Sequence, residues 1–112
     1  MNTSFRRFHR YQVFAKAVVK AKYDSGQAML ESQVNNISQG GMGVYTESPL
    51  MKSTPVFVEL SFPPSDNVME ETVIEGSVAS LKEHDDHYFM GIVFDKVISH
   101  KNFMKIINQE YC

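Results

Sequence analysis

Two groups of residues in this sequence have types and spacings suited to binding an anionic or purine ligand. The first lies near the N-terminus, where Arg6 and Arg10 are four positions apart and Arg7 lies between them. A guanidinium group can pair with two phosphate oxygens at once, can bind the O6 and N7 edge of guanine, and can stack its plane on a base. Arginines at this spacing therefore indicate a site for phosphate or purine groups.

The second group is the stretch Asn36-Ile37-Ser38-Gln39-Gly40-Gly41-Met42-Gly43. Glycine lets the backbone adopt conformations and approach its neighbours in ways that a side chain would forbid. Asn36 and Ser38 add short polar side chains beside these glycines. The combination predicts a turn that touches a ligand, and an ordinary hairpin turn is the alternative.

The charge distribution favours a small anionic ligand over a long polyanion. The formal net charge of −2 argues against a general binder of DNA or RNA, because such proteins present a basic surface. Residues 1–23 contain six basic and no acidic residues, whereas the remainder contains five basic against thirteen acidic residues, a net charge of −8. An acidic body would repel a long polyanion, while the basic end could meet a small one.

Length and composition predict one cytoplasmic domain. The chain of 112 residues is long enough for a modest core, and a second domain does not fit. No apolar run reaches the length of a membrane span, and residues 1–15 lack the apolar segment of a signal peptide. The lone Cys112 argues against the disulfide framework of a small secreted domain.

Alternating apolar and polar residues predict six β-strands. A phase slip in the second strand predicts a β-bulge near Asn35-Asn36, which would re-aim Asn36. Gly76 and Gly91 lie inside strands, where glycines commonly relieve tight bends. Turns are expected at 24–26 and 63–67, and a polar loop at 83–87. The expected strand ranges are 11–23, 27–37, from 42 to the residue before Pro49, 56–62, 71–82 and 88–94.

The end of the chain changes to helical spacing. Phe103, Ile106, Ile107 and Tyr111 fall on one face of a short helix, with Ser99 as its N-cap. Six consecutive strands favour an all-β fold, a closed six-stranded antiparallel β-barrel with a C-terminal α-helix, because closure removes exposed edges. We expect an N-terminal arginine-bearing arm over residues 1–11 and a single domain over residues 12–112.

Both groups of residues together resemble the PilZ domain family, which binds the bacterial messenger cyclic di-GMP. Its motifs RxxxR and (D/N)xSxxG match Arg6-Arg7-Phe8-His9-Arg10 and Asn36-Ile37-Ser38-Gln39-Gly40-Gly41. Further matches are Gly91-Ile92-Val93-Phe94 in the last strand and the closing helix. Each motif is weak alone, but both in this order on six strands make a specific match that covers nearly the whole chain.

The resemblance implies a role for each matching residue. Arg6 and Arg10 would clasp phosphates and guanine edges, with Arg7 as an auxiliary. Asn36 would meet a guanine edge through its amide, where many relatives use aspartate, and loses the charge assistance that a carboxylate would give. Ser38 would hydrogen-bond nearby, and Gly40 and Gly41 would let the main chain lie close to the ligand.

The resemblance also implies a mode of action. The ligand is often bound by this family as an intercalated pair of nucleotides, and no cofactor is needed. If binding orders the arm, a new surface forms that a downstream protein partner can recognise. Another cyclic dinucleotide is compatible with the same arginines.

Other chemistry has weaker support in the sequence. The segment His84-Asp85-Asp86-His87 has metal-ligand residue types, but no other Cys or His is clearly nearby, so a solvated turn is favoured and we assign no metal. Ser38 has no obvious histidine partner, so we assign no catalytic residue and expect no enzyme. The pair Leu50-Met51 could form an apolar patch for a partner, although core or loop filling is favoured.

Two alternative functions remain open. One is a PilZ-like protein-interaction module that does not bind the nucleotide, which a nucleotide titration would detect. The other is a small barrel that binds single-stranded nucleic acid through aromatic platforms and a basic groove. Phe62, Tyr88 and Phe94 alternate mostly as core within an acidic body, which disfavours this second alternative.

Overall fold

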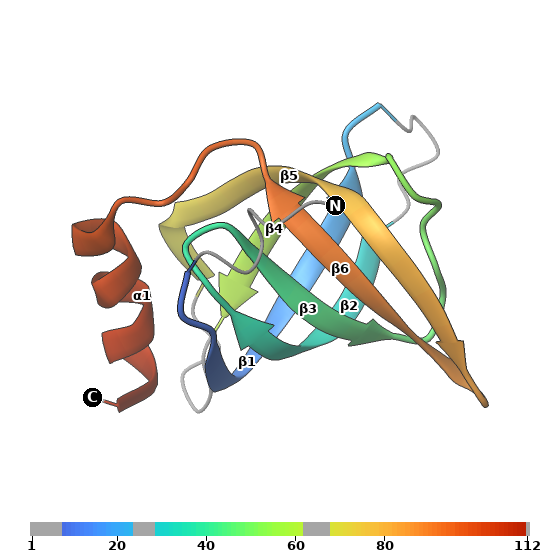
Figure 1. The fold of residues 1–112 in the computed structure, drawn as a ribbon, viewed down its shortest axis with the longest axis horizontal. Helices are drawn as coiled ribbons and strands as arrows, with labels where there is room; N and C mark the ends of the chain where they lie inside the picture. The colour runs from blue at the N-terminus through green and yellow to red at the C-terminus, as the bar shows by residue number, and fades with distance from the viewer. Residues whose placement is uncertain (1–7, 24–28, 62–67, 112) are drawn as a thin grey trace.

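The computed structural model describes residues 8–23, 29–61 and 68–111 of the chain. Six strands and one helix follow one another within these residues, as the sequence predicts (Figure 1). The turn expected at 24–26, Phe62 and the turn expected at 63–67 lie outside the described residues. The elements are β1 (Tyr11–Ala21), β2 (Met29–Ile37), β3 (Gly41–Thr46), β4 (Pro55–Ser61), β5 (Val68–His84), β6 (His87–Phe94) and α1 (His100–Tyr111).

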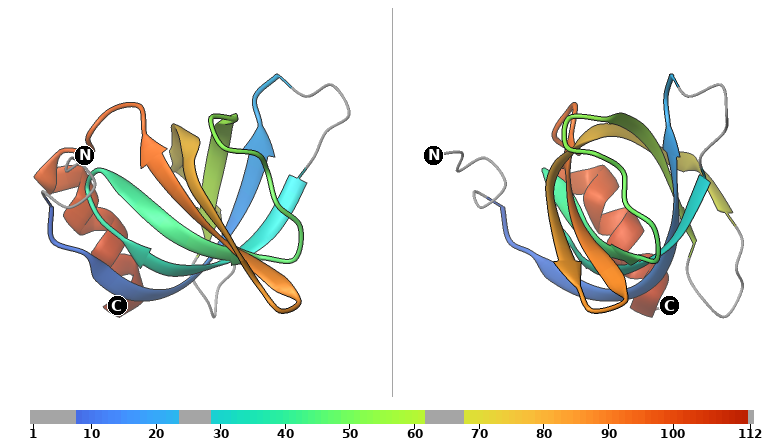
Figure 2. Two further views of the ribbon diagram at one scale, coloured as in Figure 1. Left: turned by 45° about the vertical axis from the view of Figure 1, so that its right-hand side comes forward. Right: turned by 90° about the vertical axis from the view of Figure 1, so that its right-hand side faces the viewer.

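The strands close into an antiparallel barrel in the order β1-β2-β3-β6-β5-β4, in which β1 also pairs with β4. Figure 2 shows the closed ring of strands and, at one end of it, helix α1. Closure leaves no strand of the barrel without a neighbour on either side. The predicted all-β barrel with a C-terminal helix is therefore confirmed.

Strict alternation of side chains builds the core. In β1 the buried residues Val13, Ala15, Ala17 and Val19 alternate with residues that are exposed or half-buried. Strand β4 buries Val56, Val58 and Leu60 in the same way. Helix α1 adds three buried residues to the same core, namely Phe103, Ile106 and Ile107.

Helix α1 begins where the sequence predicts. The Ser99 hydroxyl accepts a hydrogen bond from the Asn102 backbone N–H at 3.2 Å, the contact of an N-cap residue. The ring of Phe103 packs against Tyr11 at a centroid distance of 5.5 Å, which fixes the helix beside the first residue of β1. Among the described residues, no helix combines the length and the apolar character that crossing a membrane requires.

The loop between β5 and β6 is much shorter than predicted. His84 and His87 form the last pair of the ladder, so Asp85 and Asp86 alone make the turn. Asp85 has a φ of 29°, in the left-handed region that two-residue hairpins require and that aspartate tolerates. The polar composition of 83–87 hid this hairpin, because its outermost strand residues face solvent on both sides.

Gly76 allows a close approach between two strands. A Cβ at this position would lie 2.4 Å from the backbone oxygen of Val93 on β6, far inside contact distance. Gly76 therefore lets β5 and β6 approach each other closely, a role other than the relief of a tight bend that the sequence predicted. None of the described glycines has a positive φ, so their conformational freedom is not used.

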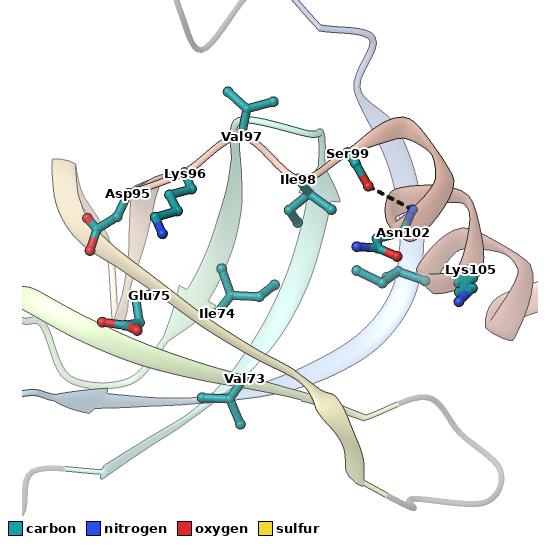
Figure 3. A pocket seen from close by; sticks show the side chains of 11 residues that line it. Val73, Ile74, Glu75, Asp95, Lys96, Val97, Ile98, Ser99, Asn102 and Lys105 are labelled. Carbon is teal, nitrogen blue, oxygen red and sulfur yellow. Dashed lines mark hydrogen bonds between the residues drawn. The ribbon is translucent and has the colours of Figure 1, made fainter.

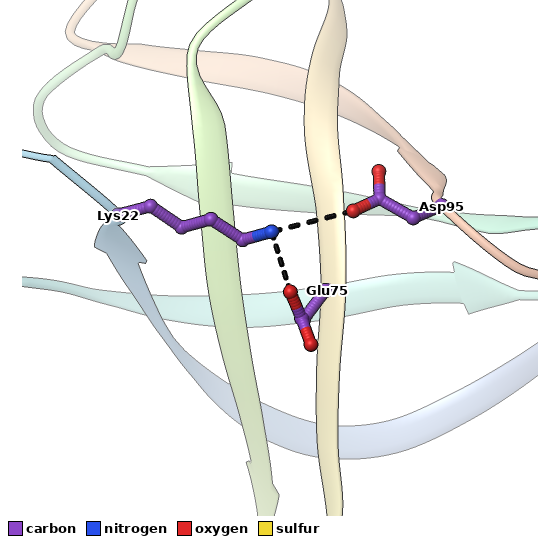
Figure 4. Close-up of polar contacts among 3 residues, drawn as sticks. All are labelled: Lys22, Glu75 and Asp95. Atoms are coloured by element: carbon purple, nitrogen blue, oxygen red, sulfur yellow. Dashed lines mark hydrogen bonds and ion pairs between the residues drawn. The ribbon is translucent and has the colours of Figure 1, made fainter.

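An ion cluster links the end of β1 to β5 and to the residue after β6 (Figure 4). Lys22 Nζ donates to Glu75 Oε1 at 2.6 Å and to Asp95 Oδ2 at 3.3 Å, and it lies 5.2 Å from the centre of the Phe57 ring. The hydrogen bond to Glu75, followed by the bond to Asp95, raises the pKa of Lys22 above its ordinary value of 10.5, against the opposing effect of desolvation.

We predict that Lys22→Met lowers the melting temperature by an amount that depends on pH. A raised pKa in the folded state stabilises the protein fully below the unfolded pKa of 10.5, and this contribution is lost as pH rises through the folded value. The difference in melting temperature between parent and variant should therefore be constant from about pH 7 to 9 and shrink above about pH 10.5. Lys52→Met, at an exposed turn position, is the control. A difference that persists unchanged at the alkaline end would contradict the role of the ion cluster.

Candidate ligand site

The structure brings Arg10 next to the glycine-rich stretch. The register between β1 and β2 pairs Tyr11 with Ile37 and Gln12 with Asn36. In this antiparallel register the residue before Tyr11 approaches the residue after Ile37, so the exposed Arg10 lies beside the turn that starts at Ser38. Arg6 and Arg7 lie outside the described residues.

A β-bulge in β2 turns two asparagines away from the core. Val34 pairs with Val44 and Asn36 pairs with Gly43, so Asn35 is an extra residue on β2. Val34 and Ile37 remain in the core on either side of the bulge. Asn35 and Asn36 are therefore both displaced toward the outer face of the barrel, and the bulge expected near Asn35-Asn36 is confirmed.

Asn36 is enclosed but not fully hydrogen-bonded. Asn36 is only 9% exposed, and its buried Oδ1 atom has no hydrogen-bond partner among the residues that the structure describes. Leaving a buried acceptor unpaired costs about 1–3 kcal/mol, so such an atom is expected to have a use. An N–H donor of a ligand would satisfy it.

Gly43 makes room for this arrangement. A Cβ at Gly43 would lie 2.5 Å from Phe89 Cζ and 3.2 Å from Asn36 Nδ2. Gly43 also pairs directly with Gly91 across β3 and β6, so two residues without side chains face each other on the outer wall. The role of Gly43 is thus close approach, and the unusual backbone conformation that the sequence also suggested for these glycines is not observed.

Ser38 holds the turn that follows Asn36. It is fully buried, and its backbone N–H donates to Gly41 O at 2.8 Å. Its hydroxyl accepts from the Gly40 N–H at 3.2 Å and donates to Gly41 O at 3.4 Å. These contacts fix the positions of Gly40 and Gly41, so the role that the structure shows for Ser38 is to stabilise the turn.

The same turn is tied to the connection between β6 and α1. Gly40 O accepts from Phe94 N–H at 3.0 Å, and Gln39 O accepts from Ile98 N–H at 2.8 Å. The Gln39 side chain donates from Nε2 to Ile98 O at 2.9 Å. Sequence analysis missed Gln39, because its partner is 59 positions away and no local pattern indicates the contact.

A row of aromatic rings continues outward from Asn36, and the sequence analysis did not identify it. Phe89, next to Gly43, packs on Tyr45 at 5.0 Å between ring centres, and Tyr45 meets His87 at 5.4 Å. His87 in turn stacks on His84 at 5.5 Å. The cross-strand pair of Tyr45 and Phe89 could have been found only once the register between β3 and β6 was known.

The described residues give no support to the alternative of a metal site. They contain no group of three or more His, Cys, Asp or Glu placed to hold a metal ion. The rings of His84 and His87 stack at an interplanar angle of 18°, and His87 Nδ1 lies 3.1 Å from Asp86 Oδ1. That hydrogen bond lowers the pKa of Asp86 below its ordinary value.

The other candidate positions from the sequence are structural or solvent-exposed. Phe94 is buried in the core and Tyr88 is half-buried, so neither forms an exposed aromatic platform. Leu50 packs against the core, whereas Met51 is largely exposed.

A separate hollow lies between β5, the β6–α1 connection and α1 (Figure 3). It has a volume of about 720 Å³, and Ile74, Ile98 and Ile106 contribute apolar side chains to it. Of the site residues predicted from sequence, none of those that the structure describes lines it. Ile98, however, connects it to the turn through the backbone bonds to Gln39.

Comparison with known proteins identifies the family. The sequence model of the PilZ domain family matches residues 4–110, and the chain therefore belongs to this family. No curated protein sequence is similar enough to be counted as a match.

Solved structures show the same fold. YcgR of Escherichia coli in complex with c-di-GMP is similar with a TM-score of 0.69 and 17% identity, over 93% of this chain and 45% of that one. The PilZ domain of YcgR from Escherichia coli with c-di-GMP gives a TM-score of 0.66 and 18% identity over 95% and 88% of the two chains. The Bacillus subtilis inhibitor of motility (MotI/DgrA) is similar with a TM-score of 0.66 and 12% identity, over 88% of this chain and 46% of that one. The chain thus spans about half the length of YcgR and of MotI/DgrA as solved.

We predict that Ser38→Ala lowers the free energy of unfolding by about 1–3 kcal/mol, because it leaves the buried Gly40 N–H without its acceptor. Denaturant unfolding measures the change. The control is Ser48→Ala, at an exposed serine whose backbone oxygen accepts a hydrogen bond from the Thr46 hydroxyl, a bond that the substitution keeps. Equal stability of the two variants would show that the serine does not hold the turn.

Proposed function

We propose that this chain is a receptor for cyclic di-GMP, which binds on the outer wall of the barrel at Asn36 and is covered by the N-terminal arginines. Membership of the PilZ family supports this, as do two structural neighbours that were solved with c-di-GMP. The observation that carries the proposal is the buried Oδ1 atom of Asn36, which no described residue hydrogen-bonds and which lies beside a glycine-lined wall.

The chemistry of Asn36 fits a guanine edge. Its free Oδ1 is an acceptor, and guanine presents N–H donors that an amide oxygen can accept. Because the amide is neutral, this contact contributes about 1 kcal/mol and mainly fixes the orientation of the base. Ser38 supports the contact from behind by holding Gly40 and Gly41 in the turn, where their main chain can lie close to the ligand.

The arginines supply most of the binding energy in this proposal. A hydrogen bond to a charged group contributes about 1.5–3 kcal/mol, so a few such bonds account for a micromolar affinity of roughly −8 kcal/mol. Arg10 lies next to the Ser38 turn through the β1–β2 register. Arg6 and Arg7 belong to the same arm of residues 1–11 and would add further contacts to phosphates, to guanine edges or to a second, intercalated nucleotide.

Binding would change the surface that a protein partner meets. The arm leaves the barrel at Tyr11, whose ring packs on Phe103 of α1 and on His9. The turn is bonded through Gln39 to Ile98, just before α1. A ligand that contacts both the arm and the turn therefore acts at two points that border the helix, and the rearranged surface is what the downstream partner would recognise.

The proposed receptor is an adaptor rather than an enzyme. It acts by binding its ligand and works in the cytoplasm of a bacterium. The ligand binds between the domain of residues 12–112 and the arm of residues 1–11. It needs no cofactor and does not bind DNA or RNA, since its body is acidic.

We predict that Arg10→Ala abolishes binding of cyclic di-GMP at low micromolar concentration, because several charged hydrogen bonds are lost, while the melting temperature of the free protein is nearly unchanged. Isothermal calorimetry with a panel of cyclic dinucleotides measures affinity, identity and stoichiometry together.

Lys52→Ala removes one exposed positive charge far along the chain and serves as the matched control, which should bind like the parent. Arg10→Ala binding with the parent's affinity would contradict the role of the arm. A parent protein that gives no heat with any cyclic dinucleotide would favour the alternative of an interaction module that has lost the messenger.

A further inference from the structure

A second hollow, lined in part by polar residues, adjoins the proposed ligand site on the outer face of the barrel. It has a volume of about 520 Å³ and is lined by Gln12, Val13, Gln33, Val34, Asn35 and Tyr45. Two of these residues are next to Asn36: Gln12 is its cross-strand partner, and Asn35 precedes it in the chain. The hollow therefore begins where the proposed contact with the ligand ends.

The lining of this hollow has the chemistry of a nucleobase site. Gln12, Gln33 and Asn35 contribute three side-chain amides, each with donors and an acceptor, which is what the edge of a purine requires. No charged residue lines it among those that the structure describes, so it lacks the cationic partner that a phosphate favours. A neutral, flat, polar-edged group is the occupant that fits.

Tyr45 supplies an aromatic surface for such a group. Its ring is 5.0 Å from Phe89 and 5.4 Å from His87, both on β6, so two neighbours hold it from one side. Its cross-strand partner on the other side is Gln33, which lines the hollow. A ring held in this way can stack on a base with little loss of side-chain freedom.

The hollow on the opposite flank of Tyr45 is different. It has about 650 Å³ and includes Lys16, Glu31 and Glu47, so charges of both signs border it. Tyr45 and Gln33 line both hollows and form the ridge between them. The uncharged hollow, which adjoins Asn36, is the one suited to a base.

We propose that Tyr45, with the amides of Gln12, Gln33 and Asn35, forms a nucleobase subsite next to Asn36, in which one purine of the bound dinucleotide stacks on the Tyr45 ring. This inference rests on the proposed function, because it assigns part of the same ligand. It adds four residues that neither family motif contains, and it places part of base recognition on the barrel, apart from the contacts that the arm makes.

Calorimetry with cyclic di-GMP tests the subsite on the full chain. Stacking on an aromatic ring is lost in Tyr45→Ala, which should lower the affinity about ten- to one-hundred-fold, whereas Tyr45→Phe keeps the ring and should stay within about threefold of the parent. Tyr23→Ala, at an exposed tyrosine that lines neither hollow, is the matched control and should bind like the parent. If Tyr45→Ala does not fold, Tyr45→Leu keeps apolar volume against Phe89 and should show the same loss.

The outcomes separate the subsite from the receptor function. If the parent binds cyclic di-GMP and Tyr45→Ala or Tyr45→Leu binds it with the same affinity, the subsite is overturned and the receptor function stands. Parent protein that does not bind cyclic di-GMP would overturn both. A second readout is the NMR signal of the Tyr45 ring, assigned from its absence in Tyr45→Phe, which should shift upfield when a base stacks on it and would stay in place if the base binds elsewhere.

Discussion

The β-bulge at Asn35 is the constraint on which the proposed ligand site depends. Without the extra residue, β2 would send Asn36 to the core side and Ile37 to the surface, because side chains alternate along a strand. With it, Ile37 stays buried while Asn35 and Asn36 both leave the core. The barrel thus keeps its packing and presents two adjacent amides on its outer wall, one enclosed beside Gly43 and one lining the uncharged hollow.

Hydrogen bonds and ring packing connect the turn after this bulge and the start of β1 to the chain around the start of the C-terminal helix. Ser38 closes the turn after Asn36, and Gln39 bonds that turn to Ile98. The Tyr11 ring, at the start of β1, packs on Phe103 of α1. The turn after Asn36 and the start of β1 therefore both contact the chain around the start of the helix.

The sequence predicted the features that depend on local pattern. The alternation of apolar and polar residues predicted the six strands, and Ser99 predicted the start of the helix. The slip in this alternation near Asn35 predicted the bulge. It could not give contacts that depend on pairing between distant strands. The aromatic row at Tyr45 and the bond of Gln39 to Ile98 need the β3–β6 register and the barrel closure, and the unpaired state of Asn36 Oδ1 needs its three-dimensional surroundings.

The most direct test of the account is the thermal stability of Asn36→Leu with and without cyclic di-GMP. Leucine has the same branching as asparagine but no unpaired acceptor, so the melting temperature of the free variant should equal or exceed that of the parent. The stabilisation that a fixed excess of cyclic di-GMP gives the parent should be smaller in the variant by about 1 kcal/mol, the contribution of the lost contact to binding. A variant that is clearly less stable than the parent when free, yet gains as much from the ligand, would contradict the claim that this buried carbonyl is kept for the ligand.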